Sequence, residues 1–177
     1  ESQEAFRLRV SERLRHKHRA VSQQDYEQLA LTAFPAIGDA KCLTGPDGQV
    51  TVVVAPVRPG GDRMPKLSAG ALSDVAKYLH DLMPAGAGNL VIRSPHYDRV
   101  RVSAWVDADD REMDALLYAL EVAVDKVIAP WLFDENEPLR IGPAESRIDV
   151  TRIQQALAEV PQVRAVSAVS LVLFSVA

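Results

Sequence analysis

The spacing of apolar positions along the chain switches several times between a helical and a strand period. Apolar residues three or four apart predict helices over 3–16, 22–34, 68–83, 109–128 and 150–159. Alternating or continuous β-rich runs predict strands over 36–43, 49–57, 90–93, 99–106 and 163–176. Consecutive strands joined by hairpin turns, together with helices that have a single apolar stripe, favour an α+β fold. The expected architecture is a two-layer helix-on-sheet arrangement with mostly antiparallel strands.

The helix expected over 22–34 has clear start and stop signals. Ser22 is a good N-cap, and Asp25 stands three residues later, where a capping box places its acid. Val21 and Tyr26 occupy the two positions of a hydrophobic staple. Pro35 ends the helix, because a proline cannot continue the hydrogen-bond ladder.

The second half of the chain carries the strongest helix and two strands of different character. Asp109 is the expected cap of that helix, with Glu112 at the box position. Its predicted buried stripe is Met113, Leu116, Leu117, Leu120, Val124, Val127 and Ile128. The strand 99–106 alternates valine and alanine with polar residues and Trp105, which predicts one polar face, whereas 163–176 is apolar on both faces and predicts a central strand.

We divide the chain into a helical N-terminal segment, 1–35, and an α+β domain, 36–177. Subdomains at about 36–95 and 96–177 are a further division of that domain. A chain of 177 residues with 47% hydrophobic residues can bury a core of this size. Because the chain begins at Glu1 inside a helical pattern and ends inside an apolar run, we expect it to be the C-terminal portion of a longer protein.

Candidate catalytic and metal-binding residues do not assemble into a site. Cys42 is the single cysteine, which suits a reducing cytoplasm and excludes an internal disulfide, and its place in an alternating strand predicts a packed thiol. His16 and His18 lack a third ligand at a convincing spacing. The acidic cluster 107–114 lacks the glycine and distal glutamate of a calcium loop and is typical of a helix N-terminus. We therefore expect no enzymatic activity, no cofactor and no metal, and no apolar run reaches the length of a membrane span.

The charge is distributed unevenly. Residues 7–19 contain six basic residues and one acidic residue, whereas the remainder contains 14 basic and 23 acidic residues, a net charge of −9. This basic strip could contact an acidic protein surface, and its predicted interface residues are Arg13, Arg15, Lys17 and Arg19. The alternative is a regulatory or nucleic-acid-binding domain that uses the same strip. Nucleic-acid binding is disfavoured, because no aromatic residues alternate with the arginines and the overall charge is negative.

Several short motifs in a fixed order resemble the baseplate J-like protein family of contractile phage tails and contractile injection systems. The first is the basic "RLRHKHRA" run followed by Val21, Ser22, and Asp-Tyr-Glu at 25–27. The later ones are the Tyr-Leu pair at 78–79, Pro95 and Tyr97 before a Val-x-Val strand, "APWLFD", "LRIGP" and "EVPQV". The resemblance runs from about residue 11 to about 172; Gln162 departs from the usual glycine, and the loop after Trp131 is less glycine-rich than in many members.

The resemblance implies a structural role in the baseplate wedge, in which the chain mediates subunit assembly and the triggering of sheath contraction. It implies as partners a second baseplate J-like subunit, the small lysozyme-like wedge protein, and hub and sheath proteins. It also implies assembly in the bacterial cytoplasm and a place in the baseplate of the mature particle. Trp131 and Phe133, in the "APWLFD" motif, join the basic strip as candidate interface residues.

Overall fold

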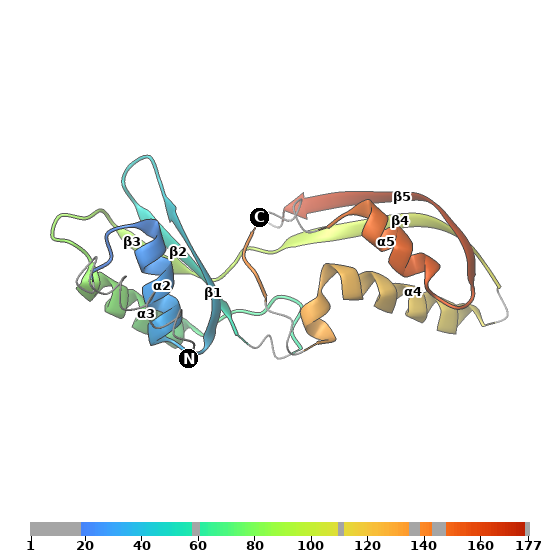
Figure 1. Cartoon of the computed structure of the whole chain (residues 1–177), viewed down its shortest axis with the longest axis horizontal. Helices are drawn as coiled ribbons and strands as arrows, with labels where there is room; N and C mark the ends of the chain where they lie inside the picture. The colour runs from blue at the N-terminus through green and yellow to red at the C-terminus, as the bar shows by residue number, and fades with distance from the viewer. Residues whose placement is uncertain (1–18, 58–60, 110–111, 135–138, 143–147, 176–177) are drawn as a thin grey trace, which may run out of the picture. The chain divides into compact units, whose positions relative to one another are not determined.

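The computed structural model describes residues 19–57, 61–109, 112–134, 139–142 and 148–175. These residues form α2 (Gln23–Ala33), β1 (Ile37–Thr44), β2 (Val50–Pro56), α3 (Ala69–Leu82), β3 (Leu90–Arg93), β4 (Asp98–Ala108), α4 (Met113–Ile128), the 3-10 turn η1 (Pro130–Leu132), α5 (Val150–Ala158) and β5 (Val163–Ser175), as Figure 1 shows. The predicted α+β class is confirmed: the helices pack on two small sheets whose strand pairs are mostly antiparallel. The helix predicted over 3–16 lies outside the described residues.

The described residues fall into two compact units. Unit 1 contains 19–57, 66–95 and 139–141, and unit 2 contains 61–65, 96–109, 112–134, 142 and 148–175. α2 belongs to unit 1, where its buried Tyr26 and Ala30 contribute to the same core as β1 and β2. The division of the chain at 35/36 and near 95/96 stays a prediction.

Unit 1 is a three-stranded sheet covered by α2 and α3. The strand order is β1-β2-β3, with β1 and β2 antiparallel and β2 and β3 parallel. The core between sheet and helices includes Val52 and Val54 of β2 and Val75 and Leu79 of α3, each at most 1% exposed. A bulge interrupts the β1–β2 ladder at Gly38, where an added Cβ would lie 2.6 Å from the Cα of Val57, so only glycine fits there.

The capping box predicted for α2 is confirmed. The Ser22 hydroxyl accepts a hydrogen bond from the backbone N–H of Asp25, and the Asp25 carboxylate accepts one from the backbone N–H of Ser22 at 2.7 Å. Tyr26 is buried, but Val21 remains 60% exposed. The predicted hydrophobic staple between these two residues therefore buries little apolar surface at the start of α2. The Ser68 hydroxyl caps α3 in the same way, accepting from the backbone N–H of Ala71.

Unit 2 is a long two-stranded ribbon with helices along one side (Figure 1). β4 and β5 are antiparallel over almost their whole length, α5 packs against β5, and α4 packs against α5. The prediction that 163–176 is a central strand is wrong for the part of the chain that the structure describes, where β5 pairs with β4 alone. No other described element of unit 2 covers the second apolar face of β5, and Val172 and Phe174 are exposed.

The start and the buried face of α4 also differ from expectation. The helix begins at Met113 with Glu112 as N-cap and without a side-chain capping bond, while the backbone N–H of Asp109 donates to the carbonyl of Gln162. Of the predicted stripe, Leu116 is buried, whereas Met113 and Leu117 are about half exposed. One thin ribbon and one short helix cannot cover so wide an apolar stripe.

Candidate interaction surfaces

The basic strip lies almost entirely outside the described residues. Arg13, Arg15 and Lys17 are not described, and Arg19 is exposed. The next residue, Ala20, is fully buried, and its backbone N–H donates to the carbonyl of Leu82 at the end of α3, at 2.9 Å. Ala20 is therefore the first core residue of the described chain, although Val21 beside it is exposed.

Trp131 and Phe133 lie on and directly after η1, at the end of α4. The Trp131 indole N–H donates to the backbone carbonyl of Asp62 at 3.2 Å, so this side chain already has a partner within unit 2. Phe133 is 47% exposed, and the Lys126 ammonium lies 5.9 Å from its ring centroid. Phe133 therefore has the larger surface available for a partner, and the interface role of both residues stays a prediction.

Two further contacts attach residues 61–65 to the rest of unit 2. The Tyr97 hydroxyl donates to the carbonyl of Pro65 at 2.5 Å, and the Arg63 guanidinium pairs with the Asp125 carboxylate on α4. Burial raises the pKa of Tyr97 to about 12, and the Asp62 carboxylate adds to the effect. The Tyr97 hydroxyl therefore stays protonated and remains a donor throughout the neutral range.

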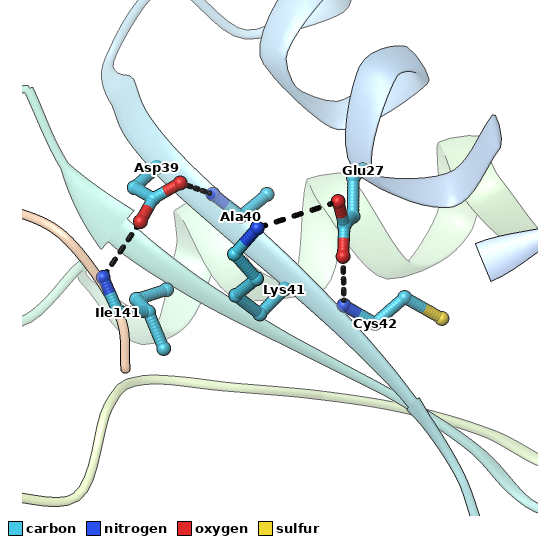
Figure 2. Close-up of polar contacts among 6 residues, drawn as sticks. All are labelled: Glu27, Asp39, Ala40, Lys41, Cys42 and Ile141. Carbon is cyan, nitrogen blue, oxygen red and sulfur yellow. Dashed lines mark hydrogen bonds and ion pairs between the residues drawn. The ribbon is translucent and has the colours of Figure 1, made fainter. Parts of the chain in front are cut away.

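Two carboxylates form hydrogen bonds along the β1 edge of the unit 1 sheet (Figure 2). The Glu27 carboxylate, on α2, accepts from the backbone N–H of Cys42 at 2.9 Å and forms an ion pair with Lys41 at 3.7 Å. The Asp39 carboxylate accepts from the backbone N–H of Ile141 at 2.6 Å. Asp39 also accepts from the backbone N–H of Ala40 at 3.0 Å, so carboxylates occupy the backbone donors of Ala40 and Cys42 on β1, an edge strand that could otherwise pair with another chain.

Cys42 is packed, as the sequence predicts. It is 5% exposed, and burial together with the nearby Glu27 carboxylate raises the pKa of its thiol to about 11. The thiol is therefore protonated at neutral pH, and the thiolate is the reactive form of cysteine. This geometry assigns Cys42 to the core.

Neither a metal cluster nor a membrane helix is found in the described part of the chain. No group of three or more histidine, cysteine, aspartate or glutamate side chains there could hold a metal ion. None of the helices in that part is long and apolar enough to cross a membrane. His16 and His18 lie outside the described residues.

The two most exposed large apolar side chains of the described residues lie in unit 2, and neither was among the predicted sites. Trp105 on β4 is 76% exposed, and Tyr118 on α4 is 70% exposed. The signal was present in the sequence, since Trp105 stands on the polar side of an alternating strand. Exposing a tryptophan side chain on the polar face of a strand costs free energy in water, unless a partner surface covers it.

The fold is similar to that of a known baseplate chain, although sequence comparisons found nothing. No protein-family model matches the chain, and no curated protein sequence does either. A chain in the cryo-EM structure of the anti-feeding prophage (AFP) baseplate, 6-fold symmetrised, matches with a TM-score of 0.62 and 22% sequence identity. The match covers 97% of this chain and 38% of the baseplate chain. The two therefore share a fold, and the present chain spans less than two fifths of the length of its structural neighbour.

Proposed function

We propose that this chain is a structural component of the baseplate of a contractile tail or injection system. The observation that carries the proposal is the likeness of fold to an AFP baseplate chain over 97% of the present chain. The ordered motifs that resemble the baseplate J-like family support it independently, because they come from the sequence alone. An assembly role also fits the surface of unit 2, where large apolar side chains such as Trp105 and Tyr118 are exposed.

Within the baseplate we assign the chain to the wedge. The resemblance suggests a second baseplate J-like subunit, the small lysozyme-like wedge protein, and hub and sheath proteins as its partners. In this role the chain would hold neighbouring subunits together and pass the triggering movement to the sheath. No reaction is needed for that function, and the exposed charges would set orientation and association rate more than affinity.

The basic strip is the part of the chain that we propose docks on an acidic face of a neighbouring subunit. The test is to co-express the wedge partners with a variant in which Arg13, Arg15 and Arg19 are all changed to Glu. We expect the variant to fold and to be lost from the purified wedge complex. Normal co-purification would overturn the docking role of the strip.

A matched control separates this effect from the change of net charge. Lys66, Lys77 and Arg93 are exposed in unit 1, and changing all three to Glu alters the charge by the same amount. We expect this control to assemble normally. Generic DNA titrated at two salt concentrations tests the alternative, because a nucleic-acid-binding strip would give salt-steep binding that the strip variant loses.

A further inference from the structure

The outer face of the β4–β5 ribbon, turned away from the helices, combines cationic and aromatic side chains. From Arg99 onward the exposed residues of β4 alternate with half-buried neighbours and are Arg99, Arg101, Ser103, Trp105 and Asp107; Asp98, at the start of the strand, is exposed as well. Cross-strand pairing places Arg99 opposite Phe174 and Arg101 opposite Val172. The Arg101 guanidinium lies 5.1 Å from the Phe174 ring centroid. This end of the ribbon is therefore apolar, with positive charge above the apolar surface.

The outer face of α4 has the opposite charge and a similar apolar content. Met113, Leu117 and Tyr118 are 49%, 52% and 70% exposed, respectively. Asp114 and Glu121 are exposed beside them, and the spacing of three and four residues places all five on one side of the helix. The buried Leu116 points to the opposite side, toward the unit 2 core. This surface is therefore apolar with negative charge beside the apolar side chains.

We propose that these two faces are the halves of one interface, in which the ribbon's outer face in one copy of the chain docks on the α4 outer face of a second copy. The apolar side chains of the two faces would cover each other, and Arg99 and Arg101 would meet Asp114 and Glu121. Tryptophan, tyrosine and arginine are the residue types that contribute most to protein interfaces. The inference rests on the two faces alone and does not depend on the baseplate function.

This contact is heterologous, because each copy uses a different face toward each of its two neighbours. Such contacts lead to a ring when the rotation between copies closes and to an open chain when it does not. An isologous dimer, in which both copies use the ribbon face, would bring together two faces that each carry two arginines and one acidic residue, Asp107. Charge complementarity therefore favours the heterologous arrangement over ribbon-to-ribbon pairing.

The test is sedimentation velocity of the full chain over a series of concentrations. We expect reversible self-association, weakened roughly tenfold or more by Arg101→Glu or by Glu121→Arg, since each puts like charges together. A mixture of the two variants should associate again. In that mixture one junction pairs the unchanged ribbon with the unchanged helix, and the other pairs the two reversed charges.

Two control variants and one surface variant complete the experiment. Arg93→Glu and Asp74→Arg make the same charge changes on an exposed strand residue and an exposed helix residue of unit 1, and should leave the association unchanged. Trp105→Ser should abolish it while keeping the thermal unfolding temperature, because the side chain is largely exposed. A chain that is monomeric at every concentration would overturn the proposal. So would an association that the charge reversals do not alter, or that the mixture does not restore.

Discussion

The Glu27 carboxylate accepts a hydrogen bond from the backbone N–H of Cys42 at 2.9 Å, across 15 residues of sequence. The contact joins α2 to the edge strand of the unit 1 sheet. It has two consequences: it satisfies an N–H at the edge of the sheet, and it places a negative charge beside a buried thiol. Both consequences are open to measurement.

Replacing Glu27 with Ala should lower the free energy of unfolding by about 1–2 kcal/mol, because a backbone donor loses a charged acceptor. Glu27→Gln should cost less, since it keeps an acceptor oxygen. Urea denaturation of the three proteins gives the comparison. Lys41→Ala is the control for the ion pair and should have little effect, because Lys41 is half exposed. Equal losses in the Lys41 and Glu27 variants would show that the ion pair, and not the backbone contact, is the stabilising element.

Alkaline pH should destabilise the fold through Cys42 and Tyr97. Their pKa values are about 11 and about 12 in the folded chain, against ordinary values of 9.0 and 10.0. As pH rises the unfolded chain loses these protons first, so the unfolded state is favoured. The free energy of unfolding should therefore be level below about pH 9 and fall from there through about pH 11 to 12.

Urea midpoints measured across this range check the alkaline prediction. Cys42→Ala should remove the part of the decline that begins near pH 9, and Tyr97→Phe the part that begins near pH 10, after allowance for each variant's lower stability at neutral pH. A decline of unchanged slope in both variants would assign the effect to other groups.

Ala168 holds a backbone conformation that suits glycine better. Its φ is +50°, and it is the single residue other than glycine with a positive φ in the described ranges. It sits where the β4–β5 register shifts between Ser103↔Ser170 and Trp105↔Ser167, so β5 has one extra residue there. Ala168→Gly should stabilise the chain by about 0.5–1 kcal/mol, because the left-handed conformation strains a Cβ.

Ala165→Gly is the matched control for this change. It is an exposed residue of the same strand without a positive φ, so glycine should destabilise there by about 0.5–1 kcal/mol. Thermal unfolding of both variants gives opposite signs if the strain at Ala168 is real. A loss of stability in both would show that the bulge tolerates alanine without strain.

Much of the fold was predictable from local patterns in the sequence. The Ser22–Asp25 capping box and the alternation of β4 each depend on residues a few positions apart, and both were predicted correctly. The error at α4 shows the limit of that reasoning. Asp109 has the chemistry of an N-cap, but α4 begins only at Met113, and the backbone N–H of Asp109 donates to the carbonyl of Gln162, 53 residues away in the sequence.

The candidate interface was only partly accessible from the sequence. The charge imbalance of 7–19 can be counted, and Trp131 and Phe133 follow from a motif, but their exposure depends on neighbours distant in the chain. Trp131 is held by Asp62, whereas Trp105 and Tyr118 are left exposed because no third strand or further helix covers them within the described residues.

The sequence by itself determined where the described helices and strands form, that Ser22 and Ser68 cap the first two described helices, and that Cys42 packs in a core. These properties arise from local sterics and from the period of apolar residues. Tertiary structure decided that, among the described residues, β5 pairs with β4 alone and that Met113 and Leu117 of the α4 stripe are left about half exposed. The physical reason is that the same apolar pattern arises in a sequence whether a face packs on the core or on a partner. Only the tertiary structure shows whether other elements of the chain cover that face.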